Sequence, residues 1–484
     1  MHQHISASGE RAAIIGYSAQ YRVAAEVIYT ALLEGELEWI AIADPDAGRL
    51  DDIQVARTDR IDAYQVKWGA QIGSLSFNDL TCGDGDPGTE DSKGLIGQLA
   101  GGWRRICASN PAKRVVVHLV ARDIGAPSAS IPHTAGTSSK ANLQGFLTDC
   151  WSDRRWATLQ TYPPGWKPAF DVLAAAAALT ETSFFAFVQN CELELGYTIS
   201  ALPTIQNRDA SRRQADLDEL ATFLFRRIGA DRRTIRISLD ELLTSLGWEA
   251  RFKPRFLHEF PVDHLYQPIT TTVDDLEAAF ARHNCGYLAL LGTPGAGKST
   301  TLTHTLRYRH GCRVVRYYAY VPDNTAQGRG EAFHFLHDIV LALQSRGFQG
   351  GSSQAKTRDE FLEKIRYQMI EMHQKWLTDR VLNLILVDGL DHIEREQAPE
   401  RSLLNDLPLP HTVPAGVLFI LGSQTLALSG LSPAIKTHLK EDRRTIEMAP
   451  LVRSAALSML KTASLVPLLS AEQTERVYRL SGGH

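Results

Sequence analysis

A glycine-rich segment containing a lysine and two hydroxyl residues offers the clearest chemistry in this chain. Residues 292–300 read GTPGAGKST and match the pattern GxxxxGK[ST] at every fixed position. Glycines let backbone N–H groups curl around phosphate oxygens, and the amino end of a following helix adds partial positive charge. The segment therefore predicts a nucleotide phosphate site formed by Gly292, Pro294, Gly295, Ala296, Gly297, Lys298, Ser299 and Thr300.

Within this segment two side chains have distinct expected roles. Lys298 is expected to reach the β- and γ-phosphates of ATP, and the Ser299 hydroxyl to ligate Mg²⁺. A second stretch, NLILVDGLDHI at residues 383–393, brings an apolar strand to Asp388, which we expect in the magnesium shell. Asp391 has two open interpretations: it orients the attacking water, or it is a helix N-cap.

A third set of chemical groups lies near the amino end. The segments LDDIQV and YQVKW place Asp51 and Asp52 on one expected strand and Gln65 and Lys67 on the next. Side chains two apart on a strand share a face, so Gln65 and Lys67 converge, and a hairpin neighbour brings Asp52 beside them. A carboxylate and an amide oxygen suit Mg²⁺, and a nearby lysine helps to activate water for phosphodiester cleavage.

Two details of this third set are left open by the sequence. Asp51 and Asp52 cannot be separated, although Asp52 directly precedes the alternating apolar residues and is preferred. Glu26, on the preceding helix, is a further carboxylate expected to complete the metal shell. The alternative interpretation of the whole pattern is a surface strand with a solvated lysine and a capping aspartate.

The elements that must position the amino-terminal set form a small α/β core. An amphipathic helix is predicted over 16–35, followed by three short strands at 37–44, 51–58 and 61–68 that form a meander. A helix over 94–107 and an apolar strand over 114–121 come next. From about residue 144 to 247 the pattern predicts mainly helices.

After a polar, proline-bearing connection at 252–268 the pattern changes. The apolar runs GYLALLG, RVVRYYAYV, NLILVDG and GVLFILGS alternate with helical stretches. Such alternation is typical of a parallel sheet covered on both faces. Ser423 and Gln424 end the last of these strands, at a place suited to sensing the nucleotide.

Composition restricts the class of protein. The chain has 484 residues, a formal net charge of −4, 44% hydrophobic and 22% charged residues, so a general basic coat for nucleic acid is excluded. The six cysteines never fall as CxxC, which favours a reduced protein without zinc ribbons or disulfides. With neither a signal peptide nor a long apolar run, we expect a cytoplasmic protein.

The phosphate loop, the DGLDH form of the acidic strand, the LFILGS strand and the closing LSGGH resemble STAND-type signalling NTPases over residues 259–484. The resemblance implies an ATP-gated switch that assembles into a homo-oligomer, a tetramer or larger. The chain departs from many relatives at Gln424, where they carry an arginine. We also expect a carboxy-terminal sensor region that this sequence does not contain.

The segments GYSAQY, LDDIQV and YQVKW resemble PD-(D/E)XK nucleases of the cap type, in the branch with Gln in place of the second acid. The expected fold class is thus α/β: a restriction-endonuclease-like domain over residues 1–205, followed by a P-loop STAND NTPase core with a parallel sheet over 259–445. A helical connector over 206–258 joins them, and 446–484 begins a truncated helical or winged-helix module.

Together these resemblances imply an Avs-like antiphage effector. ATP and Mg²⁺ are the expected cofactors, double-stranded DNA the expected substrate, and a phage protein the expected trigger. Two alternatives remain: an ATP-switched signalling or scaffold protein with a non-cleaving amino-terminal domain, and an ATP-driven DNA-processing motor. Millimolar Mg²⁺ dependence is expected because Gln65 is neutral.

Overall fold

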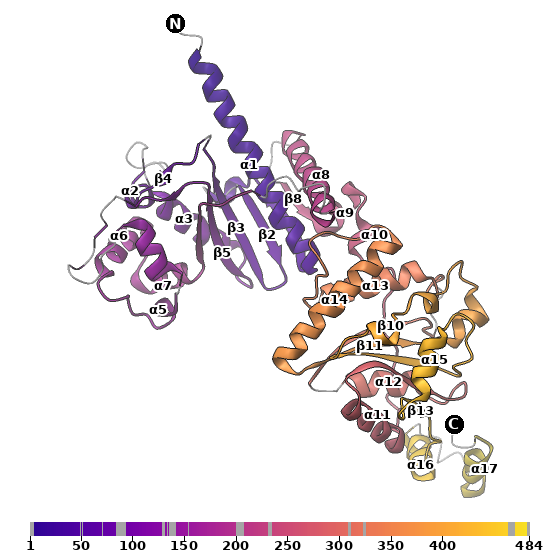
Figure 1. Cartoon of the computed structure of the whole chain (residues 1–484). Coiled ribbons are helices and arrows are strands. Elements are labelled where there is room, and N and C mark those ends of the chain that lie inside the picture. Colours follow the sequence, from indigo (N-terminus) through magenta and orange to yellow (C-terminus); the bar gives the residue numbers. More distant parts are fainter. Residues whose placement is uncertain are drawn as a thin grey trace. The chain divides into compact units, whose positions relative to one another are not determined.

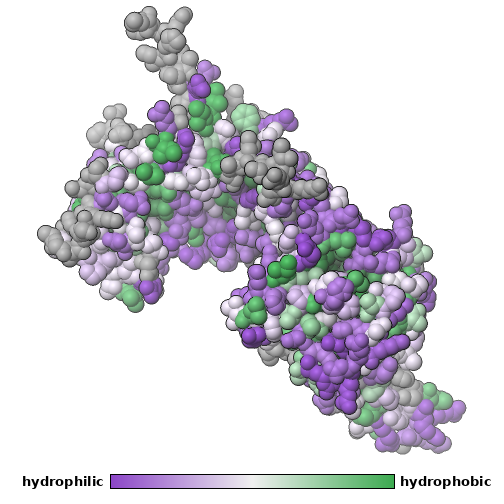
Figure 2. All heavy atoms as spheres, in the orientation of Figure 1, coloured by the Kyte–Doolittle hydropathy of each residue, from purple (hydrophilic) through white to green (hydrophobic). Residues whose placement is uncertain are grey.

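The computed structural model describes residues 4–48, 50, 52–69, 71–83, 93–127, 131–132, 134, 142–152, 154–199, 208–230, 235–307, 311–322, 326–462 and 470–481. Asp51 lies outside the described residues. The chain divides into two compact units, Met1–Glu249 and Ala250–His484 (Figure 1). Hydrophilic residues dominate the visible surface (Figure 2).

The first unit begins with a long helix followed by a three-stranded meander, then a helix and a strand. These elements are α1 (His4–Glu34), β1 (Leu37–Ile42), β2 (Ile53–Arg57), β3 (Arg60–Lys67), α3 (Leu95–Ser109) and β5 (Arg114–Ala121). Strands β1, β2 and β3 pair antiparallel, and β3 pairs parallel with β5. The predicted order of these elements agrees with the structure.

The sheet of the first unit has two further strands that the sequence analysis missed. Its order is β7-β5-β3-β2-β1-β8, with β7 (Cys191–Leu195) parallel to β5 and β8 (Ile235–Ser238) antiparallel to β1. The prediction of mainly helices over 144–247 was wrong at these two places, because CELEL and IRIS are too short for a clear alternation. Residues of the expected connector therefore extend this sheet.

Shorter elements complete the first unit. They are α2 (Phe77–Thr81), α4 (Leu143–Phe146), α5 (Arg155–Thr158), α6 (Lys167–Ala177), α7 (Glu181–Gln189), α8 (Arg208–Ala230), α9 (Leu239–Leu246), and the two-residue strands β4 (Ser74–Leu75) and β6 (Ile124–Gly125). Among the described residues no single helix is long and apolar enough to span a membrane; α6 and α7 reach that length and composition only as a pair bent by 95°.

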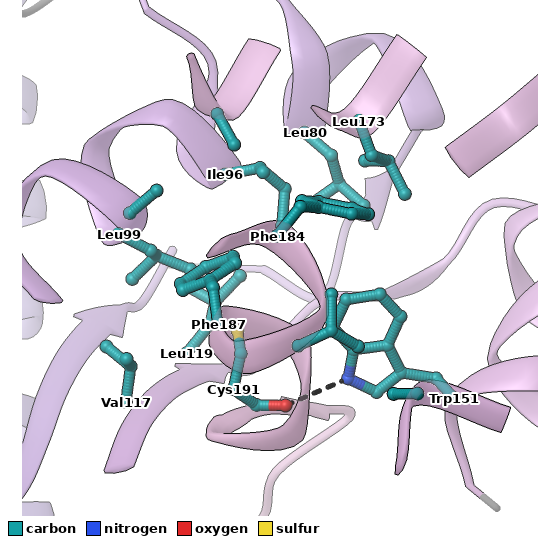
Figure 3. Packing of buried hydrophobic residues seen from close by; sticks show 14 of the residues in the cluster. Leu80, Ile96, Leu99, Val117, Leu119, Trp151, Leu173, Phe184, Phe187 and Cys191 are labelled. Atoms are coloured by element: carbon teal, nitrogen blue, oxygen red, sulfur yellow. Dashed lines mark hydrogen bonds between the residues drawn. The ribbon is translucent and has the colours of Figure 1, made fainter. Parts of the chain in front are cut away.

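The two faces of this sheet bury different sets of residues. Alternate residues of β3, such as Ile61 and Ala63, join Leu119 of β5 in a core closed by α3, α6 and α7. Figure 3 shows this packing, with the Trp151 indole N–H donating to the carbonyl of Cys191 at 3.1 Å. Helix α1 packs on β1, β2 and β3 and also against α8.

The second unit is built on a five-stranded parallel sheet, as predicted. Its strands are β9 (Cys285–Leu291), β10 (Cys312–Tyr318), β11 (Leu382–Asp388), β12 (Val417–Ser423) and β13 (Thr445–Glu447), in the order β10-β11-β12-β9-β13. The sequence analysis missed β13, which has only three residues.

Helices cover both faces of this sheet. They are α11 (Thr270–Arg282), α12 (Lys298–Arg307), α13 (Ala332–Gln344), α14 (Arg358–Asp379) and α15 (Pro433–Lys440). The short α10 (Glu249–Phe252) comes before them, and α16 (Arg453–Thr462) and α17 (Ala471–Ser481) come after them and contact each other. Apolar residues of α13 and α14 pack on one face and those of α11 and α12 on the other. Because parallel strands end at one edge, Leu291, Asp388 and Ser423 lie close together there.

Candidate functional site

The phosphate loop connects β9 to α12 in the second unit. Gly295 and Gly297 have φ angles of 76° and 85°, a left-handed conformation that side chains disfavour. The Lys298 ammonium group donates to the carbonyls of Gly292 at 2.8 Å and Thr293 at 3.0 Å. Burial lowers the pKa of Lys298, while the charges of Asp391 and Asp388 act in the opposite direction.

A cavity of about 330 Å³ opens over this loop. Of the residues predicted to bind phosphate, those that line it are Pro294, Gly295, Gly297, Lys298, Ser299 and Thr300. Gly292 contributes its carbonyl to Lys298 instead, and Ala296 is buried beneath the loop. The structure thus gathers the predicted segment around one space large enough for phosphate groups.

Asp388 ends β11 at the floor of this cavity. It is buried, and neither carboxylate oxygen has a hydrogen-bond partner of ordinary geometry among the described residues. Burial raises the pKa of Asp388; the nearby Ser299 hydroxyl and the Lys298 charge act against this rise. The neighbouring Gly422 leaves room for the carboxylate, since a Cβ there would lie 1.8 Å from Asp388 Oδ1.

Asp391 lines the same cavity and is held by the end of the next strand. Its Oδ1 accepts the backbone N–H of Gln424 at 3.2 Å, and its Oδ2 accepts the Gln424 side-chain amide. The turn that follows, Ile393–Gln397, has His392 at its N-cap position without a side-chain cap. The hydrogen bonds of Asp391 therefore favour the cavity role over the N-cap interpretation.

Five cavity residues were missed by the sequence analysis: Phe260, Tyr320, Gly389, His392 and Arg395. The rings of Tyr320 and His392 stack with centroids 3.8 Å apart and planes 5° from parallel. Arg395 Nη2 lies 2.9 Å from His392 Nδ1. A basic residue three positions after the histidine in DGLDHIER was the available signal.

The segment before the nucleotide loop is fixed by a buried carboxylate of α13. Asp338 accepts the backbone N–H groups of Arg255 and Phe256, at 2.8 Å and 3.1 Å, and lies 3.0 Å from His258 Nε2. The other ring nitrogen of His258 accepts the Tyr318 N–H at 3.2 Å. These bonds tie the chain leading to Phe260 to the end of β10.

In the first unit the structure brings Asp52 and Gln65 together. The Gln65 side-chain amide donates to Asp52 Oδ2 at 2.6 Å, and the backbone N–H of Val66 donates to the same oxygen at 2.7 Å. The other oxygen accepts the side-chain amide of Gln20, on α1, at 3.1 Å. Gln65 Oε1 is buried without a hydrogen-bond partner among the described residues.

Lys67 lies at the end of β3, on the face that its alternation with Gln65 predicts. It lines a different cavity, of about 530 Å³, together with Asp79, Lys93 and Asp123. Among the described residues, no hydrogen bond joins Lys67 to Asp52 or Gln65. The structure therefore unites two of the three predicted groups.

Glu26 is engaged away from Asp52. Its carboxylate accepts the Tyr197 hydroxyl at 2.8 Å, and Gln20, not Glu26, is the α1 residue that reaches Asp52. Six residues turn an α-helix by about 600°, which places the side chains of Gln20 and Glu26 about 120° apart around the helix axis. Within the described part of the chain, no three His, Cys, Asp or Glu side chains form a metal-binding group.

The comparisons with known proteins concern the second unit. Residues 281–424 match the family described as AAA domain, so this part of the chain is an AAA-type P-loop NTPase domain. No curated protein matches the chain.

Several solved structures are similar at low identity. Cdc6p from Pyrobaculum aerophilum aligns with 44% of this chain and 53% of its own, at 14% identity and a TM-score of 0.29. A chain of Drosophila ORC bound to DNA aligns with 44% of this chain and 49% of its own, at 15% identity and a TM-score of 0.26. The Aeropyrum pernix ORC1 protein in complex with DNA aligns with 42% of this chain and 51% of its own, at 16% identity and a TM-score of 0.27. The alignments thus span about half of each relative.

Proposed function

We propose that the second unit binds and hydrolyses ATP with Mg²⁺. The observation that carries this proposal is the buried Asp388 carboxylate beside the phosphate loop, whose two oxygens lack a hydrogen-bond partner of ordinary geometry among the described residues. Such a carboxylate next to a serine hydroxyl is a donor set that Mg²⁺ favours. Ser299 and Asp388 would hold the ion, which when bound would offset the charge of the phosphates.

The residues around the ion have separate tasks in this proposal. Backbone N–H groups of the loop and Lys298 hold the β- and γ-phosphates, because the lysine exchanges its carbonyl partners for phosphate oxygens. Asp391 orients the attacking water through one carboxylate oxygen. Gln424 holds Asp391 in place with two hydrogen bonds.

For the first unit we propose a metal-dependent DNA endonuclease that ATP binding switches on. The supporting observation is the contact between Asp52 and Gln65. Rotation of the Gln65 amide would turn the buried Oε1 toward a divalent ion held by Asp52, replacing the present N–H donor. Lys67 would then offset the charge that develops on the DNA phosphate.

The larger role follows from the resemblances described above. ATP binds an assembled homo-oligomer better than the single chain, and assembly brings several nuclease units onto double-stranded DNA. A phage protein is the proposed trigger, and defence against phages the proposed purpose.

One observation favours a second candidate, a first unit that binds partners without cutting. Lys67 lines a cavity of its own rather than contacting the Asp52–Gln65 pair. The motor alternative has no comparable observation in its favour.

Plasmid cleavage tests the nuclease proposal. Supercoiled DNA is incubated with the full chain, Mg²⁺ and ATP, for the wild type, Lys67→Ala and Lys167→Ala. Lys167 is an exposed lysine of α6 and serves as the matched control. Lys67→Ala should cut roughly a hundredfold more slowly, and the control should match the wild type.

Metal binding provides a test that needs no trigger. Bound Mn²⁺ is measured by electron paramagnetic resonance in the Lys298→Ala background, which removes the nucleotide site, with Asp52→Asn and the exposed Asp171→Asn compared. Loss of bound Mn²⁺ in Asp52→Asn alone supports the nuclease site. If Asp52→Asn and Asp171→Asn bind equal amounts of Mn²⁺, and Lys67→Ala behaves like the wild type in the plasmid assay, the non-cleaving alternative is favoured.

A further inference from the structure

Arg395 places a second cation on the wall of the nucleotide cavity. It belongs to the turn Ile393–Gln397, which follows β11, and it lines the cavity together with Lys298 and Asp391. Its backbone position is seven residues beyond the buried end of β11 at Asp388. The phosphate loop follows β9, so Lys298 and Arg395 reach the space from different strands.

The guanidinium group of Arg395 contacts His392, whose ring stacks on Tyr320. Arginine has no acceptor, so its contact at 2.9 Å makes His392 Nδ1 the acceptor and leaves the ring proton on Nε2. The histidine ring in turn lies flat on Tyr320, with centroids 3.8 Å apart. Arg395 is thus held by the imidazole of His392, which itself stacks on an aromatic neighbour.

The charges of the cavity show why this cation matters. Asp388 and Asp391 contribute two carboxylates, while Lys298 and Arg395 are the only Lys or Arg among the described residues that line the cavity. Without Arg395, the cavity would have two carboxylates and one cationic side chain, although its proposed ligand, a nucleotide, is itself a polyanion. The planar arginine fork suits two oxygens of one phosphate, a geometry that lysine does not provide.

The neighbours of Arg395 indicate which phosphate of the nucleotide this residue would contact. His392 Nε2 lies 3.7 Å from Asp391 Oδ2, and Asp391 contacts Gln424. This group lies at the carboxyl ends of β11 and β12, where the attacking water is proposed to stand. The loop and Lys298 hold the phosphates on the side of β9.

We propose that Arg395 recognises the terminal phosphate, and that it lets this site distinguish a nucleoside triphosphate from a diphosphate. The inference rests on the nucleotide site proposed above and adds its specificity. His392 and Tyr320 are positioning residues for the guanidinium group.

Equilibrium binding of fluorescent ATP and ADP analogues with Mg²⁺ tests this inference. The wild type, Arg395→Ala, Arg395→Lys, His392→Phe and Arg366→Ala are compared; Arg366 lies on α14 next to Tyr367, outside the residues that line the cavity. Arg395→Ala should weaken ATP binding about tenfold or more and ADP binding by less than about twofold. Arg395→Lys and His392→Phe should fall between, and Arg366→Ala should match the wild type.

Two results would overturn the inference, and they are distinct from failure of the site itself. Equal losses of ATP and ADP affinity in Arg395→Ala, at an unchanged melting temperature, would mean that the arginine does not read the terminal phosphate. Unchanged affinity for both would remove it from the site. Absence of binding by the wild type would instead contradict the nucleotide site on which the inference rests.

Discussion

The Asp391 carboxylate accepts both the backbone N–H and the side-chain amide of Gln424, and so joins the residues that follow β11 and β12. β11 ends at Asp388, and β12 ends next to Gln424, which lines the same cavity. Gln424 therefore has two effects at once: it orients Asp391, and it places a neutral amide in the cavity.

Replacing Gln424 with alanine should separate binding from hydrolysis. Loss of the side-chain bond lets Asp391 rotate, which should slow ATP hydrolysis roughly tenfold, equivalent to about 1.4 kcal/mol. Affinity for ATP should change by less than about threefold, because the loop contacts persist. Phosphate release and nucleotide binding measure the two effects, with the exposed Gln374→Ala on α14 as control. Equal hydrolysis by wild type and Gln424→Ala would contradict this role.

Asp388→Ala should raise stability while it removes hydrolysis. Burial raises the folded-state pKa of Asp388 above that of the unfolded chain, so its unfavourable effect on folding grows as pH rises from the unfolded-state pKa toward the folded-state pKa. Removing the carboxylate should stabilise the chain by about 1 kcal/mol near pH 7, and less at low pH. Thermal unfolding without Mg²⁺ and an ATPase assay measure both effects. A lower melting temperature at pH 7 would argue against an uncompensated carboxylate.

Gln65→Glu should make the first unit depend more on a divalent ion. The change replaces the amide donor to Asp52 with a second carboxylate, so without metal the chain should lose about 1–2 kcal/mol of stability. With Mg²⁺ the two carboxylates should hold the ion, and half-saturation of cleavage should shift about tenfold lower. Gln98→Glu, on α3, provides a matched charge change. An identical Mg²⁺ titration for Gln65→Glu and wild type would exclude Gln65 as a metal ligand.

His258 predicts a pH dependence of stability for the second unit. Burial lowers its pKa, although the Asp338 carboxylate acts in the opposite direction. The unfolded chain therefore binds the proton more readily, and stability is lost as pH falls below about 6.5 toward the folded-state pKa. His258→Gln keeps a donor and an acceptor without titrating, so the free energy of unfolding should vary less between about pH 7.5 and 5.5.

The exposed His264→Gln is the control for that measurement. Urea unfolding at each pH gives the free energies. If the free energy of unfolding changes with pH equally in His258→Gln, the wild type and the control, His258 does not set the pH dependence of stability.

Sequence patterns predicted the regular parts of both units because those parts follow simple periods. The motif GTPGAGKST and the apolar runs ending at Leu291, Asp388 and Ser423 predict a parallel sheet and the edge at which its nucleotide site lies. The pairing of Asp52 with Gln65 followed from the short hairpin between β2 and β3.

Long-range contacts account for most of what was missed. Gln20 meets Asp52 from a helix 32 residues earlier, and β8 joins β1 from the far end of the unit. Arg395 lines the cavity beside His392, whose ring stacks on Tyr320 from an earlier part of the chain, and no local spacing reveals that contact. Lys67 shares a face with Gln65, yet its longer side chain lines another cavity.

Nucleotide at the loop is proposed to control cleavage by the other unit. DNA cleavage by the full chain with Mg²⁺ is measured with ATP, with ADP and without nucleotide, for the wild type, Lys298→Ala and the exposed Lys375→Ala of α14. We expect the wild type and Lys375→Ala to cut with ATP alone, and Lys298→Ala not to cut under any condition. Cleavage by Lys298→Ala at the wild-type rate, whatever the nucleotide, would contradict the account.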